Sequence, residues 1–199
     1  AIVTFHPVTL ELDDLKKQLG ELTKALDHAA SVFGLQYLIT FPNADVGSTF
    51  IIDEWEKFVN NRSDRKLVKS LGQTRYLSAL KFLSLMIGNS SSGLVEAPSF
   101  SLPVVNIGNR QKGRMRGKNV FDVDCISSEI IKGIESSMNW DRSIPCFNPY
   151  GDGNASSKIL KHLYSIFSKY SRKEIISKKF ISTKEVKEVE SAFYTESED

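Results

Sequence analysis

Short runs of β-branched and aromatic residues alternate along this chain with longer segments in which apolar residues recur at helical spacing. The runs that we expect to be strands are Ile2–His6, Leu35–Phe41, Lys66–Leu71, Leu85–Gly88, Pro103–Ile107 and Val120–Val123. The segments that we expect to be helices are Asp13–Ala30, Ser48–Asn60, Thr74–Leu83, Glu129–Met138 and Ala155–Tyr170, with a short helix opening at Ser90–Gly93. This alternation predicts an α/β fold, a Rossmann-like three-layer arrangement in which helices cover both faces of a parallel sheet.

Local signals refine the helices. Ser48 is placed to cap the second helix, and Ser127 or Ser128 the helix that begins at Glu129. In the last helix, the apolar residues share one side, which we expect to be buried: Ile159, Leu160, Leu163, Ile166 and Phe167.

The length of 199 residues is enough for one domain with its own core, which we place at 1–170. The remaining 171–199 are charged and rich in Ser, and we expect a docking arm or a partly disordered end, with a helix near Thr183–Phe193. Ala1 leads directly into an apolar run, without an initiator Met. We therefore expect the chain to be one domain of a longer protein.

The charge balance excludes some classes of partner. The chain has 26 basic and 24 acidic residues, a net charge of +2, so it has no general attraction for nucleic acid or membranes. No apolar stretch approaches the roughly 18 residues of a membrane span, and no leader peptide is recognisable. Cys125 and Cys146 are too far apart in sequence for a zinc or redox pair. We therefore expect a cytoplasmic protein with reduced thiols and no metal.

The loop Gly88–Pro98 contains the first candidate site. It follows a strand, opens a helix, and carries Ser90, Ser91 and Ser92, whose hydroxyls and backbone N–H groups can surround an anion. Glu96 lies one helical turn further on, where a carboxylate can accept hydrogen bonds from the two hydroxyls of a ribose. Diphosphate donors and a ribose acceptor together indicate a nucleoside diphosphate. The alternative is an ordinary strand-to-helix turn with a Glu that the helix dipole favours.

The next loop, Asn106–Lys118, carries five cations among three glycines. Arg110 is the best placed of them for bidentate contact with phosphate oxygens. For Lys112, Arg116 and Lys118, we expect a solvated basic loop.

Three further residues follow strand ends or open the next helix, and are therefore expected at the same edge of the sheet. His6 can serve there as an acid, a base or a phosphate donor, although a lone histidine is more often structural. Asn43 follows the second strand. Tyr76 follows the third and could stack on a base, or equally fill the core.

Two patterns are set aside. Gly151-Asp152-Gly153 lacks a preceding strand and a third glycine, which excludes NAD, and we expect no cofactor. Asn89–Gly93 lacks the glycine of a serine-nucleophile turn.

Five motifs occur in an order that resembles the carboxyl-terminal half of UDP-N-acetylglucosamine 2-epimerases. They are His6-Pro7-Val8-Thr9, Phe41-Pro42-Asn43-x-Asp45-x-Gly47-Ser48, Gly88-Asn89-Ser90-Ser91-Ser92-Gly93, Asn106-Ile107-Gly108-x-Arg110-Gln111-x-Gly113-Arg114 and Asn148-Pro149-Tyr150-Gly151-Asp152-Gly153. The resemblance runs from about Ile2 to Phe167. The serine and arginine loops look more like the hydrolysing branch, since the non-hydrolysing branch typically has Asp-Ser-Gly-Gly at the serine loop.

The resemblance implies the second domain of a glycosyltransferase-B-type fold, which binds UDP and UDP-N-acetylglucosamine. The implied reaction eliminates UDP to a 2-acetamidoglucal and hydrates it to N-acetylmannosamine, in sialic acid or polysaccharide biosynthesis. By the resemblance, Ser90, Ser91, Ser92 and Arg110 contact the diphosphate and Glu96 contacts the ribose. Tyr76 and Leu71 lie at the uracil, Asn43 contacts UDP, and His6 is a cleft histidine needed for activity.

The family's acidic proton-transfer residues belong to an amino-terminal domain, which this chain lacks. We therefore expect the chain alone to bind UDP without turnover, and the full-length protein to be a homo-oligomer. Two alternatives remain open, a stand-alone nucleotide-sugar binding module and a glycosyltransferase domain.

Overall fold

Six parallel strands form one sheet in the order β3-β2-β1-β4-β5-β6. Their bounds are β1 Ile2–Thr4, β2 Tyr37–Thr40, β3 Arg65–Val68, β4 Met86–Gly88, β5 Val104–Ile107 and β6 Val120–Val123. This is the strand order of a dinucleotide-binding Rossmann sheet, so the predicted α/β class and parallel sheet are confirmed. The computed structural model describes residues 1–177 and divides the chain into two units, Ala1–Asp152 and Gly153–Asp199.

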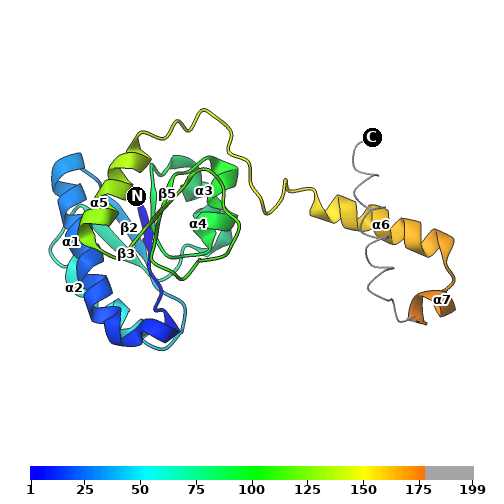
Figure 1. Cartoon of the computed structure of the whole chain (residues 1–199), viewed down its shortest axis with the longest axis horizontal. Helices are drawn as coiled ribbons and strands as arrows, with labels where there is room; N and C mark the ends of the chain where they lie inside the picture. The colour runs from blue at the N-terminus through cyan, green and yellow to red at the C-terminus, as the bar shows by residue number, and fades with distance from the viewer. Residues whose placement is uncertain (178–199) are drawn as a thin grey trace. The chain divides into compact units, whose positions relative to one another are not determined.

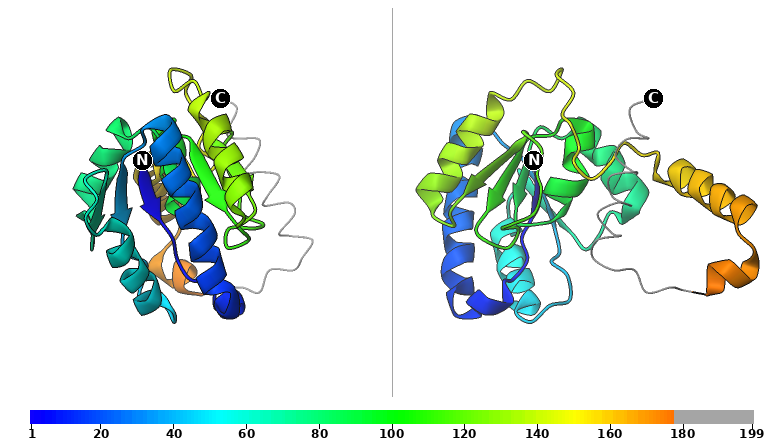
Figure 2. Two further views of the ribbon diagram at one scale, coloured as in Figure 1. Left: turned by 90° about the vertical axis from the view of Figure 1, so that its left-hand side faces the viewer. Right: turned by 45° about the vertical axis from the view of Figure 1, so that its right-hand side comes forward.

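Helices cover both faces of the sheet in the first unit (Figure 1). The helices are η1 Thr9–Asp14, α1 Leu15–Phe33, α2 Ser48–Val59, α3 Gly72–Phe82, α4 Ser92–Val95, η2 Ala97–Phe100 and α5 Ser127–Met138. Buried residues of α1, α2 and α5 share one apolar cluster, while α3 and η2 contribute to a second. In Figure 2, α1 and α5 lie side by side on the same face. The three predicted layers are therefore present.

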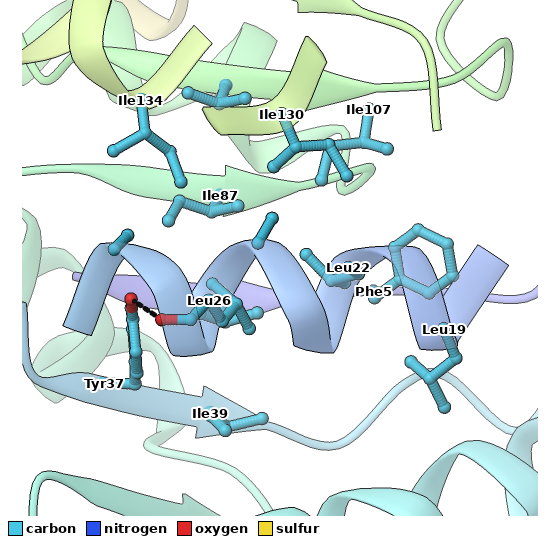
Figure 3. Packing of buried hydrophobic residues seen from close by; sticks show 14 of the residues in the cluster. Phe5, Leu19, Leu22, Leu26, Tyr37, Ile39, Ile87, Ile107, Ile130 and Ile134 are labelled. Carbon is cyan, nitrogen blue, oxygen red and sulfur yellow. Dashed lines mark hydrogen bonds between the residues drawn. The ribbon is translucent and has the colours of Figure 1, made fainter. Parts of the chain in front are cut away.

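The apolar runs of the strands serve both faces, because successive side chains point to opposite sides of a sheet. In β1, Ile2 belongs to the α3 side and Val3 to the α1 side, and both are fully buried. Figure 3 shows Leu22 and Leu26 on α1, in the same apolar cluster as Ile39 of β2 and Ile87 of β4. The hydroxyl of Tyr37 donates to the carbonyl of Leu26 over 2.7 Å, which ties β2 to α1 without leaving the buried phenol unpaired.

The neighbouring positions of β1 and β4 in the sheet determine which loops can surround a ligand. The chain leaves β1 toward β2 and leaves β4 toward β5, so the loops after these two neighbours diverge and leave a crevice. Gly88 closes β4 with φ of +137°, and a Cβ at this position would lie 1.9 Å from the carbonyl oxygen of Thr4. Only glycine permits this approach of the two strands.

Two helix caps differ from the sequence predictions. Gly47, with φ of +90°, is the N-cap of α2, and the Ser48 hydroxyl instead donates back to the carbonyl of Asn43. Neither Ser127 nor Ser128 caps α5. The carboxylate of Glu21 on α1 accepts the N–H of Ser127 over 2.8 Å and does so from another helix. Tertiary packing thus supplies the partners that local sequence was expected to provide.

The second unit contains α6, Ala155–Lys169, and α7, Arg172–Ile176. The predicted helix is present, but the side expected to be buried is exposed, with Ile159 at 57% and Phe167 at 66%. Helical periodicity predicts which residues share the apolar side of α6. It does not predict whether another part of the protein covers that side. The predicted domain extent of 1–170 stays a prediction, and the helix expected near Thr183–Phe193 lies outside the described residues. Within 1–177, no helix is long and apolar enough to cross a membrane.

Candidate functional site: a cavity at the carboxyl ends of four strands

A cavity of about 420 Å³ opens where β1, β2, β3 and β4 end. Of the nine residues proposed from sequence for the site, it is lined by His6, Asn43, Leu71, Tyr76, Ser90 and Ser92. Residues up to 86 positions apart in the chain therefore meet at one edge of the sheet, as parallel topology requires. Ser91, Glu96 and Arg110 do not line this cavity.

His6 is held at both its backbone and its ring. It is 5% exposed and follows β1 directly. The backbone N–H of Asn43 donates to Nδ1 of His6 over 3.1 Å. Burial, helped by the charge of Arg110 and opposed by Asp45, lowers the pKa of His6 to about 4. The imidazole is therefore neutral in the free protein at neutral pH.

Asn89 organises the loops around this histidine. Its side chain is 1% exposed; Oδ1 accepts the N–H of His6 over 2.7 Å, and Nδ2 donates to the carbonyl of His6 over 2.8 Å. Its own carbonyl accepts from Gln111 Nε2 at 2.8 Å and from Arg110 Nη1 at 3.3 Å. One buried asparagine thus links the loops after β1, β4 and β5.

Arg110 lies at this junction rather than in open solvent. Burial lowers the pKa of Arg110, an effect that Arg114 reinforces and Asp45 opposes. Its guanidinium donates to the carbonyl of Asn89, and its charge helps to lower the pKa of His6. A fixed cation beside a neutral N–H donor suits an anionic ligand.

Tyr76 and Ser92 lie on facing elements of the cavity. Their hydroxyls hydrogen-bond to each other, so in the ligand-free protein Ser92 is already engaged. Burial raises the pKa of Tyr76; the hydrogen bond with Ser92 opposes this effect and the nearby charge of Glu96 adds to it. Oε2 of Glu96 is buried and has no hydrogen-bond partner within residues 1–177. An unsatisfied carboxylate oxygen of this kind suits a ligand hydroxyl.

The serine loop opens a short helix, as the sequence predicts. The helix that it opens, α4, spans only four residues before Glu96 and η2 follow. Its dipole is correspondingly small, because few peptide units are aligned. The serine hydroxyls and Arg110 therefore remain the main candidates for anion contacts.

Like Arg110, the other cations of the basic loop do not line this cavity. Lys112 and Arg116 line a separate hollow of about 380 Å³ at the ends of β5 and β6. Arg116 there forms an ion pair with Asp122, which also accepts from Asn106 over 2.7 Å. Lys112 and Lys118 are exposed, as expected for a solvated basic loop, whereas Arg116 is partly buried and paired with Asp122.

Comparison with known proteins places this geometry in a family. Residues 1–164 match the family model described as UDP-N-acetylglucosamine 2-epimerase. The chain belongs to this epimerase family. It is 34% identical over 165 residues to the hydrolysing UDP-N,N′-diacetylbacillosamine 2-epimerase of Legionella pneumophila, a match that covers 83% of this chain and 42% of that protein. It is 38% identical over 122 residues to the hydrolysing GDP/UDP-N,N′-diacetylbacillosamine 2-epimerase of Campylobacter jejuni, covering 61% of this chain and 31% of that protein.

The fold agrees with solved epimerase structures. The UDP-N-acetylglucosamine 2-epimerase of Methanocaldococcus jannaschii, in complex with UDP-N-acetylglucosamine and UDP, superimposes with a TM-score of 0.64 at 16% identity. That match covers 83% of this chain and 45% of the epimerase. The chain therefore spans less than half the length of these family members and has the fold of one half of such an enzyme.

Some site residues could not be identified from sequence. Asn89 was part of a recognised motif, but its two bonds to His6 cross 83 positions and leave no local signal. Lys69 and Gln73 also line the cavity. Their one signal in the sequence is their position near the end of β3, because the loops after neighbouring parallel strands meet at one edge of the sheet.

Proposed function

We propose that this chain is the UDP-binding half of a hydrolysing UDP-N-acetylglucosamine 2-epimerase. The whole enzyme would eliminate UDP to a 2-acetamidoglucal and hydrate it to N-acetylmannosamine. The observation that carries the proposal is the convergence of His6, Asn43, Tyr76 and Ser90 on one cavity at the carboxyl ends of β1–β4. Membership of the epimerase family and the hydrolysing activity named for both relatives support it.

The ligand's parts have distinct candidate partners. Ser90, Ser91, Ser92 and Arg110 would bind the diphosphate. Contact with Ser92 requires its bond to Tyr76 to open or be shared. The unpartnered Oε2 of Glu96 would accept from a ribose hydroxyl.

The remaining residues would bind the base and the cleft side of the nucleotide. Tyr76 and Leu71, which both line the cavity, would contact uracil. Asn43 would contact UDP from the loop after β2, and His6 would act at the cleft.

A second sugar is a candidate for the substrate. Both relatives are named for UDP-N,N′-diacetylbacillosamine, and one of them also for the GDP form. UDP-N,N′-diacetylbacillosamine is therefore the second candidate substrate. Release of UDP and a free 2-epimeric sugar from each substrate, measured with the full-length protein, distinguishes the two.

Turnover would need the rest of the protein. The chain spans 42% and 31% of the lengths of the two relatives. We propose that the amino-terminal domain provides the acidic proton-transfer groups. The isolated chain should then bind UDP but release no N-acetylmannosamine from UDP-N-acetylglucosamine, and detectable release would contradict this part of the proposal.

A thermal unfolding experiment tests the binding function. UDP at one hundred times its dissociation constant should stabilise the chain by about 2.7 kcal/mol, because it binds only the folded state. GDP at the same concentration should stabilise it less. A chain that ends at Tyr170 should keep the UDP response if the domain extends over 1–170. No response to UDP or GDP would reject the proposal. A stronger response to GDP would indicate that the site binds guanine rather than uracil.

A further inference from the structure

The fifth sequence motif, which begins at Asn148, contacts the turn that carries Glu96. Nδ2 of Asn148 donates to the carbonyl of Val95 over 2.8 Å and to the hydroxyl of Ser99 over 2.7 Å. Val95 is the last residue of α4, and Glu96 follows it directly. One asparagine side chain therefore binds the chain on both sides of Glu96, from 53 positions away in the sequence.

The local sequence leaves the carbonyl of Val95 without a donor. In a continued α-helix this carbonyl would accept the N–H of Ser99, but that N–H donates to the carbonyl of Glu96 over 3.1 Å. A 3-10 turn would use the N–H of the residue three positions on, which is Pro98 and has none. The donor must therefore come from another part of the protein, and Asn148 provides it.

Asn148 uses its whole amide group at this position. Both hydrogens of Nδ2 are donated, and Oδ1 accepts the N–H of Tyr150 over 2.9 Å. An amide turned by half a rotation would set its oxygen against the carbonyl of Val95. Only one orientation of the side chain therefore satisfies all three partners.

The segment before Asn148 is anchored to the same part of the domain. Nη2 of Arg142 donates to the carbonyl of Phe100, the last residue of η2, over 3.2 Å. The N–H of Cys146 donates to the hydroxyl of Ser101 over 3.0 Å, directly after η2. Asn148 is thus held against the turn that it binds.

The carboxylate of Glu96 depends on the backbone that carries it. Its Oε2 is buried and has no hydrogen-bond partner within residues 1–177, so no bond at this oxygen fixes the side chain. The peptide group between Val95 and Glu96 is planar; its carbonyl accepts from Asn148, and its N–H donates to the carbonyl of Ser92 over 2.9 Å. These two bonds hold both ends of one peptide group, and with it the direction in which the side chain of Glu96 leaves the chain.

We propose that Asn148 is a positioning residue, which holds the Val95–Glu96 peptide so that the carboxylate of Glu96 meets the hydroxyls of a bound ribose. This inference rests on the proposed UDP-binding function and deepens it. Asn148 itself is not among the residues that line the cavity at the ends of β1–β4. Its loss should therefore remove the part of the UDP affinity that comes from the ribose hydroxyls and leave the rest.

Two ligands separate the position of Glu96 from general damage to the site. 2′,3′-Dideoxy-UDP lacks both ribose hydroxyls, so the ratio of its Kd to the Kd of UDP measures the ribose contact. Titration calorimetry with the 199-residue chain should give a ratio of about ten or more, the value of one hydrogen bond to a charged group. In Asn148→Ala the ratio should approach unity, because UDP binding weakens and dideoxy-UDP binding does not.

A second variant covers the case in which Asn148→Ala fails to fold. Asn148→Asp has the same size and keeps an oxygen for the N–H of Tyr150, but it loses both donors, so its ratio should fall in the same way. Asn139→Ala, at an exposed asparagine that ends α5, is the matched control and should keep the ratio. An unchanged ratio in the Asn148 variants would overturn the proposal, even if their stability falls. A ratio near unity in the unaltered chain would also overturn it.

A double-mutant cycle tests whether Asn148 acts through Glu96. In the Glu96→Gln chain, Asn148→Ala should weaken UDP binding no further, whereas additive losses would contradict the positioning role. If the unaltered chain fails to bind UDP, the proposed function fails. Amide hydrogen exchange of the free chain then still decides whether Asn148 holds the turn, since the N–H of Glu96 should exchange faster in Asn148→Ala. Equal exchange in both chains would show that it does not.

Discussion

The side chain of Asn89 and the backbone of His6 exchange two hydrogen bonds, of 2.7 and 2.8 Å. The pair joins the loop after β4 to the loop after β1 at the point where the two connections diverge. Since the carbonyl of Asn89 also accepts from Arg110 and Gln111, one residue sets the relative positions of a neutral donor and a cation.

Asn89→Ala should destabilise the chain strongly. It leaves the N–H and the carbonyl of His6 buried without partners, at a cost of about 1–3 kcal/mol for each group. Denaturant unfolding measures the loss. Asn60→Ala is the matched control, because Asn60 is exposed and should change the free energy of unfolding by about 0.5 kcal/mol or less. A similar small change for Asn89→Ala would show that water or a rearranged loop replaces both bonds.

Glu96→Gln should weaken UDP binding without lowering the free energy of unfolding. The buried Oε2 has no partner among the described residues, so removal of its charge should not lower the free energy of unfolding. UDP binding should weaken about tenfold or more, because a charge-assisted bond to a ribose hydroxyl contributes about 1.5–3 kcal/mol. Titration calorimetry measures the affinity. Glu56→Gln, at an exposed position on α2, is the control and should leave it unchanged.

Gly88→Ala should lower the free energy of unfolding, whereas Gly20→Ala should raise it. A Cβ on Gly88 would lie 1.9 Å from the carbonyl oxygen of Thr4, at a φ of +137°, so the β1–β4 pairing must break or shift. Gly20 lies within α1 and a Cβ there meets nothing within 4 Å, so alanine should stabilise by about 0.5–1 kcal/mol. Thermal and denaturant unfolding of both variants measures the difference. A stable, UDP-binding Gly88→Ala chain would contradict the close approach of the two strands.

His6 should make the stability depend on pH between about 6.5 and 4. In this range the unfolded histidine binds a proton while the folded one, with its pKa lowered to about 4, does not. The free energy of unfolding therefore rises with pH, by at most about 1.4 kcal/mol for each pH unit. His6→Gln should remove this part of the slope, and His28→Gln, at an exposed position on α1, should keep it. Equal slopes for the original chain and His6→Gln would mean that the folded ring binds its proton as readily as the unfolded one.

The periodicity of the sequence was sufficient for the sheet and its covering helices. β-Branched runs such as Ile2–Val3 and the spacing of Leu19, Leu22 and Leu26 are local properties that predict strands and helices directly. Parallel order then followed from the alternation, and with it the edge at which His6, Asn43 and Ser90 would meet. The five motifs, taken in order, indicated the epimerase family, which no single motif could identify.

Tertiary structure alone decided how the site is held. Ser48 was expected to cap α2 but holds Asn43, and Glu21 of α1 accepts the N–H of Ser127 at the start of α5. The apolar side of α6 was predicted from periodicity and is exposed in the described part of the chain. The protonation state of His6 depends on a hydrogen bond across 37 positions, and its backbone on Asn89, 83 positions away. Such contacts have no local signal, because the partners become neighbours only after the strands have paired.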